Sequence, residues 1–144
     1  MNEKEEIYLF VYGTLMSSCR QNQSYLDTAT FKGEAVLNGF SLYDFGYYPC
    51  IIADKEGKVK GELYSVPLNL LPSIDIYEAE GSLYRREQVT IQGVNGEVVD
   101  AYVYVFIKSI DNAKKIPFDY LPWYEGIGES IDQGEYEADH TGRQ

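Results

Sequence analysis

Six short runs of strand-forming residues constrain the fold of this chain more than any other feature. Each run is rich in β-branched, aromatic or other apolar residues and ends at a glycine, an Asn-Gly pair or a polar stretch. We expect hairpin turns at Asn38-Gly39 and Asn95-Gly96 and a loop over Gly46–Pro49. The predicted strands are Ile7–Val11, Phe31–Leu37, Phe40–Phe45, Val59–Val66, Tyr84–Gln92 and Val98–Ile107.

The chain has one clear helix signal, over Asn69–Glu80. Asn69 is a favourable N-cap, Pro72 falls in the first turn where no intrahelical donor is lost, and Gly81 is a helix-ending residue. A shorter helix is expected over Asn22–Asp27. Many strands with few helices predict an α+β domain or a small barrel with attached helices.

The length of 144 residues predicts a single domain over residues 1–144. Its core should cover about residues 7–110, since the regular patterns stop there. The tail, residues 111–144, is irregular and rich in Gly, Asp and Glu, and we expect it either to wrap the domain or to be partly disordered. The sequence leaves the oligomeric state open, with a monomer slightly favoured.

The formal net charge of −11 disfavours binding to nucleic acid or to an anionic membrane surface. It fits cationic or zwitterionic partners, although solubility alone also accounts for it. The polar N-terminal residues lack the pattern of a signal peptide, and no apolar run reaches the roughly 20 residues that span a bilayer. We therefore expect a cytoplasmic protein in which Cys19 and Cys50 are free thiols.

Several kinds of catalytic site are excluded by what the sequence lacks. His140 is the only histidine, and it lies in the polar tail, which disfavours a Ser-His-Asp or Cys-His site and a zinc site. Neither a phosphate-binding loop nor a dinucleotide fingerprint is found. If this chain is an enzyme, it should work with carboxylates, hydroxyls and backbone amides, with tyrosine as a further candidate.

The segment Tyr12-Gly13-Thr14-Leu15 follows the first predicted strand directly. A buried strand that ends in Gly-Thr gives a tight turn whose backbone N–H groups can converge on an anion such as a carboxylate. The alternative is an ordinary turn from a strand into a loop.

Glu78 lies on the apolar side of the predicted helix. Successive helical residues turn by about 100°, so Glu78 falls about 40° from Ile74 and inside the apolar stripe, whereas Glu80 falls about 120° away. A carboxyl group that points toward apolar side chains has a raised pKa and can act as a general acid/base near neutral pH. The alternative is a frayed last turn in which Glu78 reaches solvent or pairs with Arg85 or Arg86.

Taken together, these segments resemble the gamma-glutamylcyclotransferase-like superfamily. The family opens with a strand and a Tyr-Gly-(Thr/Ser)-Leu loop, and its later motifs follow here in the same order. They include a Gly-Glu-Leu-Tyr strand, a helix ending in Asp-x-x-Glu, and Tyr-x-Arg-x-x-Val. The matching segments are Phe10–Leu15, Gly46–Pro49, Gly61–Tyr64, Asp75–Glu78 and Tyr84–Val89.

The resemblance implies a small mixed β-barrel with attached helices and a cofactor-free enzyme. Such an enzyme cyclises a small-molecule gamma-glutamyl substrate to 5-oxoproline and releases an amine or amino compound. The resemblance makes Glu78 the general acid/base, although many members have Glu-Gly where this chain has Glu78-Ala79, so Glu80, followed by Gly81, is a lesser candidate. The substrate-binding residues are predicted to be Tyr12, Gly13, Thr14, Leu15, Tyr48 and Tyr84.

Two alternatives to that reaction remain open from the sequence. One is a cyclotransferase for gamma-glutamyl amines, in which the leaving group is a lysine side chain or a biosynthetic amine. The other is a non-catalytic module of the same fold that binds gamma-glutamyl or 5-oxoproline-like ligands. The motifs do not encode the leaving-group half of the pocket, so they do not distinguish between substrates.

Overall fold

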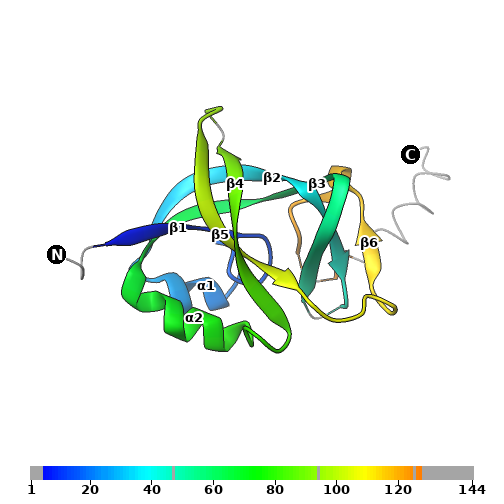
Figure 1. Ribbon diagram of the computed structural model, residues 1–144, viewed down its shortest axis with the longest axis horizontal. Coiled ribbons are helices and arrows are strands. Elements are labelled where there is room, and N and C mark those ends of the chain that lie inside the picture. The colour runs from blue at the N-terminus through cyan, green and yellow to red at the C-terminus, as the bar shows by residue number, and fades with distance from the viewer. Residues whose placement is uncertain (1–4, 47, 94, 125, 128–144) are drawn as a thin grey trace.

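A computed structural model of the chain describes residues 5–46, 48–93, 95–124 and 126–127. Five of its strands form a closed mixed barrel in the order β3-β1-β5-β4-β2, and pairing between β2 and β3 closes the ring (Figure 1). Neighbouring strands are antiparallel except β1 and β5, which are parallel. The strands are β1 (Glu6–Val11), β2 (Thr30–Asp44), β3 (Pro49–Pro67), β4 (Tyr84–Gly93) and β5 (Val98–Phe106).

Strand β1 lies between β3 and β5 and is buried on both faces toward its end. Leu9, Phe10 and Val11 are all buried in succession, which is why this strand is a continuous apolar run with no alternation. The prediction of a buried strand over Ile7–Val11 is therefore confirmed. Because β1 has a neighbouring strand on each side, the loop that follows it begins between β3 and β5.

The long β2–β3 hairpin corrects the prediction of a turn at Asn38-Gly39. β2 runs without a break from Thr30 to Asp44, and the pairing with β3 only shifts register between Asn38 and Phe40. Gly39 has φ +91° and lies at this shift, where the two steps from Asn38 to Phe40 on β2 face the five steps from Lys58 to Ala53 on β3, so the extra residues are on β3. The reversal lies instead around residues 45–48, where the Phe45 N–H donates to the Tyr48 carbonyl at 3.0 Å. As a result β3 begins at Pro49, ten residues before the predicted start.

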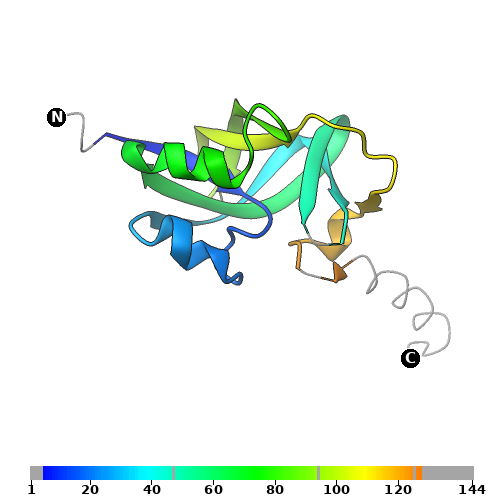
Figure 2. The ribbon, with the colours of Figure 1, turned by 90° about the horizontal axis from the view of Figure 1, so that it is seen from below.

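The first helix lies one residue earlier than predicted, and the second is shorter than predicted. The short helix α1 covers Gln21–Leu26, and α2 (Leu71–Tyr77) follows a 3-10 turn, η2 (Leu68–Leu70). Asn69 lies inside η2, and Leu70 holds the N-cap position with no side-chain capping bond, so the predicted Asn69 cap is wrong. Both helices lie on the same side of the barrel, close to β1 (Figures 1 and 2).

The first part of the tail wraps the barrel. Strand β6 (Lys114–Ile116) pairs with the end of β2, and a 3-10 turn, η3 (Phe118–Tyr120), follows it. Trp123 is buried and its Nε1 donates to the Asp44 carboxylate at 2.8 Å. Trp123 therefore packs the tail onto the barrel; residues 128–144, including His140, lie outside the described part of the chain.

Two further expectations concern the thiols and the membrane. Cys19 and Cys50 form no disulfide, as predicted. Within the described ranges, no helix has both the length and the apolar character needed to cross a bilayer.

Candidate active site

The loop that follows β1 packs closely against the start of β3. A Cβ added to Gly13 would lie 2.5 Å from the Pro49 Cγ, so only glycine fits at this position. The buried hydroxyl of Tyr12 donates to the Tyr104 carbonyl on β5 at 2.6 Å. These contacts fix the beginning of the loop between β3 and β5.

The same loop offers backbone donors. The Gly13 carbonyl accepts from the Met16 N–H at 3.0 Å, which closes a tight turn. Within the described residues, the N–H groups of Gly13, Thr14 and Leu15 have no protein acceptor. The turn therefore has the donors that an anion-binding loop requires.

Glu78 lies where α2 ends. It occupies the C-cap position, and its own N–H donates to the Ile74 carbonyl at 2.9 Å. Ala79 follows with φ +54°, a left-handed conformation that stops the helix two residues before Gly81. The predicted helix end at Glu80 is thus too late, and Glu78 is the last residue with helical backbone angles.

A small cavity of about 30 Å³ brings this glutamate and the loop together. Among the described residues, none forms a hydrogen bond or ion pair with the Glu78 carboxyl group. Burial raises the pKa of Glu78 from 4.5 to about 7. The cavity is lined by Phe10, Val11, Tyr12, Gly13, Thr14, Leu15, Pro49, Glu78 and Tyr104.

Four tyrosines surround Glu78, and each has its hydroxyl engaged elsewhere. Tyr84 donates to the Pro49 carbonyl at 2.7 Å, Tyr104 donates to Asp75 at 2.6 Å, and the Tyr77 hydroxyl lies 2.5 Å from the Thr14 Oγ1. Tyr12, the fourth, donates to a backbone carbonyl, as described above. Three of these phenols donate to other acceptors, the fourth is bonded to Thr14, and none is hydrogen-bonded to the half-buried Glu78 carboxylate.

The four phenols also stay protonated at neutral pH. Burial is the largest cause that raises the pKa of Tyr12, Tyr84 and Tyr104 well above the usual value, and the nearby Glu78 charge adds to it. The pKa of Tyr77 is raised for the same reasons. Glu78 is therefore the group in this cavity whose protonation changes near neutral pH.

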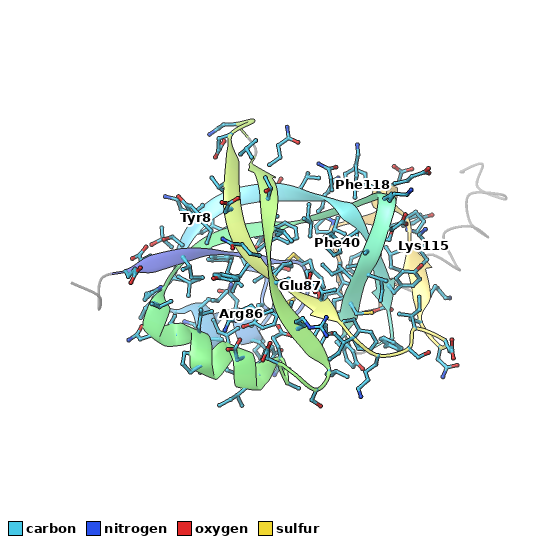
Figure 3. All side chains as sticks on the ribbon, in the orientation of Figure 1. Tyr8, Phe40, Arg86, Glu87, Lys115 and Phe118 are labelled. Carbon is cyan, nitrogen blue, oxygen red and sulfur yellow. The ribbon has the colours of Figure 1, made fainter. Side chains whose placement is uncertain are left out.

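An ion pair fixes α2 to the barrel. Arg86 on β4 donates from Nε and Nη2 to the two oxygens of Asp75, at 2.9 and 3.0 Å (Figure 3). The Arg86 bonds, followed by the Tyr104 hydroxyl, lower the pKa of Asp75. Arg86 also lies over the Tyr102 ring. Neither arginine pairs with Glu78, as the alternative would require: Arg86 holds Asp75, and Arg85 pairs with the nearby Glu87.

The predicted site residues are brought together only in part. Tyr12, Gly13, Thr14, Leu15 and Glu78 line one cavity. Tyr84 lies beside Glu78 but turns its hydroxyl toward Pro49.

Tyr48 does not line the cavity, because its ring packs on Phe45 5.4 Å away. Glu80 is exposed and accepts from the Arg86 N–H at 3.3 Å, so it faces away from the loop.

Four residues of the cavity were not among the predicted site residues: Phe10 and Val11, which end β1, and Pro49 and Tyr104. Tyr104 reaches it because β5 lies beside β1 in the barrel, and Pro49 because β3 begins earlier than expected. Both placements depend on strand order and register, which no local pattern in the sequence encodes.

The larger hollows of the structure lie away from Glu78. One of about 330 Å³ lies on the other side of the loop, where Met16 lines it while the preceding Leu15 lines the small cavity. In the part of the chain that the structure describes, no three His, Cys, Asp or Glu residues gather closely enough to hold a metal ion.

Comparison with known proteins identifies the family. Residues 9–125 match the family model described as "Gamma-glutamyl cyclotransferase, AIG2-like". The Escherichia coli K12 protein named gamma-glutamylcyclotransferase family protein YtfP is 30% identical over 108 residues, which are 75% of this chain and 89% of that protein.

Solved structures agree with this assignment. An AIG2-like protein from Mus musculus superimposes with a TM-score of 0.67 at 25% identity, covering 84% of this chain and 87% of that one. The solution structure of Escherichia coli ytfP gives a TM-score of 0.60 at 30% identity and covers 76% and 91% of the two chains. The chain therefore belongs to the gamma-glutamyl cyclotransferase, AIG2-like family.

Proposed function

We propose that this protein cyclises a gamma-glutamyl group to 5-oxoproline and that Glu78 carries the proton. One observation supports this above the others: a half-buried carboxyl group, whose pKa burial raises to about 7, lines the same small cavity as a loop with unused backbone donors. A general acid/base is most effective when its pKa lies near the working pH. The family membership supports the same class of reaction.

The substrate in this proposal carries an alpha-carboxylate and an alpha-ammonium group. The N–H groups of Gly13, Thr14 and Leu15 bind the carboxylate, because they add partial positive charge without a mobile side chain. The acidic charge of the protein as a whole does not oppose binding, since the substrate also carries a cation.

The reaction begins when the Glu78 carboxylate removes a proton from the ammonium group. The freed amine attacks the gamma-carbonyl carbon of the same molecule and closes a five-membered ring. The bond from that carbon to the leaving nitrogen then breaks, and protonated Glu78 returns its proton to that nitrogen. The ring nitrogen gives up its second proton as the lactam forms, and the released amine takes that proton up. The products are 5-oxoproline and the ammonium form of the released amine, and Glu78 is again ionised.

Holding the folded substrate supplies much of the rate in this scheme. Nucleophile and electrophile belong to one molecule, and well-oriented intramolecular reactions gain on the order of 7–11 kcal/mol from proximity. The narrowness of the cavity and the tyrosines around it suit this task, since they limit the conformations of the bound group.

The experiment is a panel of gamma-glutamyl amino acids and gamma-glutamyl amines incubated with the purified protein, with 5-oxoproline release as the readout. Glu78→Gln keeps the shape of the side chain and removes the base, so kcat should fall by about 10²–10⁴-fold. Glu80→Gln is the matched control, and we expect it to keep the wild-type rate.

Two outcomes contradict the proposal. Glu78→Gln that turns over at the wild-type rate overturns the role of Glu78. Binding of 5-oxoproline or a gamma-glutamyl compound without any turnover indicates a binding module instead. The panel also separates amino-acid leaving groups from amine leaving groups.

A further inference from the structure

The far end of the substrate-binding loop is held by a side chain of the barrel wall. Glu62 on β3 accepts from the Ser17 N–H through Oε1 and from the Ser17 hydroxyl through Oε2, both at 2.7 Å. Glu62 is paired with Val11 in the register of β1 and β3, so its backbone lies beside the residue from which the loop departs. One carboxylate thus ties the end of the loop back to its beginning.

A second set of hydrogen bonds reaches the middle of the loop from the same carboxylate. The Tyr64 hydroxyl donates to the Glu62 Oε1 at 3.2 Å. Asn22 Nδ2 uses its two hydrogens to donate to the Tyr64 oxygen at 2.9 Å and to the Leu15 carbonyl at 2.8 Å. The four residues Glu62, Ser17, Tyr64 and Asn22 are called the loop anchor below.

The donors and acceptors of the loop anchor are mutually consistent. Burial, followed by the Glu62 charge, raises the pKa of Tyr64 to about 12, so its hydroxyl keeps the proton that it donates. Asn22 has both amide hydrogens engaged, which leaves its orientation no freedom to reverse. A chain of bonds that polarise one another in sequence is stiffer than separate pairs.

The loop needs such an anchor because it has little structure of its own. Residues 12–17 belong to no helix or strand, and within the described residues the one backbone bond inside them joins Met16 to Gly13. The directions of the Gly13, Thr14 and Leu15 N–H groups are therefore set by Pro49 on one side and by the loop anchor on the other.

We propose that Glu62 is a positioning residue: through the loop anchor it orients the backbone donors that bind the substrate carboxylate. This inference rests on the proposed function. Glu62 does not line the cavity of Glu78, so it acts on the substrate through the loop and leaves the proton carrier unchanged. Its loss should weaken binding of substrate and leave the chemical step nearly intact.

The test compares Glu62→Ala with Glu62→Gln by steady-state kinetics on the best substrate of the panel. Alanine removes both carboxylate oxygens that accept from Ser17 and Tyr64, and we expect KM to rise about tenfold with kcat within about twofold of wild type. Glutamine keeps an acceptor for the Ser17 N–H and can donate to the Ser17 hydroxyl, so KM should return to within about twofold of wild type. The pH dependence set by Glu78 should be unchanged in both.

Glu34→Gln is the matched control. Glu34 lies opposite Glu62 on the neighbouring strand, is exposed, and among the described residues makes no side-chain hydrogen bond. Its removal changes the charge beside Glu62 without touching the loop anchor, so KM should keep its wild-type value. A tenfold rise in this control would assign the effect to charge and overturn the inference.

A measurement without turnover separates this inference from the proposed function. Hydrogen exchange of the Ser17 amide should become about tenfold faster in Glu62→Ala and stay near wild type in Glu62→Gln. Unchanged exchange together with an unchanged KM overturns the inference even when Glu78→Gln is inactive. Should Glu62→Ala fail to fold, Ser17→Ala and Asn22→Ala each remove a single link and should each raise KM.

Discussion

The hydroxyl groups of Thr14 and Tyr77 lie 2.5 Å apart and join the loop after β1 to the last turn of α2. Tyr77 immediately precedes Glu78, so this bond fixes the distance between the loop donors and the carboxylate. The Tyr77 ring is held in turn by Tyr25 of α1, with ring centroids 4.4 Å apart. Two helices and one loop thus meet at a single pair of hydroxyls.

Thr14→Val should therefore lower kcat/KM for 5-oxoproline release. Valine has nearly the same volume as threonine, and it leaves the Tyr77 hydroxyl without its partner and the loop free to shift. A misplacement of this kind costs on the order of tenfold to 10²-fold in rate. Thr14→Ser keeps the hydroxyl and should stay close to wild type; equal rates for the two variants would contradict the role of the bond.

The proposed base predicts the pH profile. Because the pKa of Glu78 is raised to about 7, kcat/KM should rise about tenfold per pH unit below pH 7 and level off above it. The surrounding phenols have raised pKa values, so none of them should contribute to the rise of kcat/KM below pH 7. The measurement is 5-oxoproline release at low substrate from pH 5 to 9, and a profile flat through pH 7 would exclude Glu78 as the base.

The ionised Glu78 carboxylate should lower the free energy of unfolding. The pKa of Glu78 in the folded protein, about 7, lies above the ordinary value of 4.5, so between these values the folded state holds a proton that the unfolded state has lost. The free energy of unfolding should therefore fall as pH rises from about 4.5 to about 7, by at most about 3 kcal/mol.

Glu78→Gln removes that cost, since glutamine carries no charge. The variant should be more stable than wild type at pH 8, with the difference disappearing toward pH 4.5. Urea unfolding at the two pH values is the measurement, and Glu80→Gln, at an exposed position, should show no such dependence. A Glu78→Gln protein that is no more stable at pH 8 would mean that the carboxylate is well solvated.

Ala79 holds a conformation that favours glycine. Its φ of +54° costs an alanine roughly 1 kcal/mol relative to glycine. Ala79→Gly should thus stabilise the fold by about that amount, measured by urea unfolding, with 5-oxoproline release unchanged. Gly81→Ala, at φ +90°, is the converse variant and should destabilise it by a similar amount. If Ala79→Gly is no more stable than wild type, the positive φ at Ala79 carries no measurable strain.

Helix α2 ends before Ala79, where the chain has no glycine. The Glu-Gly pair seen in many members of the superfamily becomes Glu78-Ala79 here, and Ala79 still adopts the glycine-type conformation. The angular argument that separated Glu78 from Glu80 placed both side chains correctly, because α2 has about two helical turns and Glu78 still has helical backbone angles. The helix end was mispredicted because Gly81 was a more obvious stop signal than Ala79.

The sequence was least informative where the barrel closes. Local patterns predicted β1, β4 and β5 to within about one residue at each end, since strand periodicity is a local property. The register shift at Gly39 was mistaken for a turn because an Asn-Gly pair fits both, and only the pairing with the partner strand decides between them. Tyr104 was missed for the related reason that barrel neighbours are not neighbours in the chain. The extent of the domain over residues 1–144 stays a prediction.

The position of β1 between β3 and β5 has a consequence for how activity appears during folding. Leu9 pairs with Tyr102, more than half the chain away, and this parallel contact is expensive in loop entropy and so forms late. Before it forms, Tyr104 is not beside Tyr12 and the carboxylate of Glu78 remains in water as an ordinary acid. A partly folded chain thus has all the residues of the site and none of its chemistry, and the appearance of a carboxyl group titrating near neutrality would mark the moment at which the barrel closes.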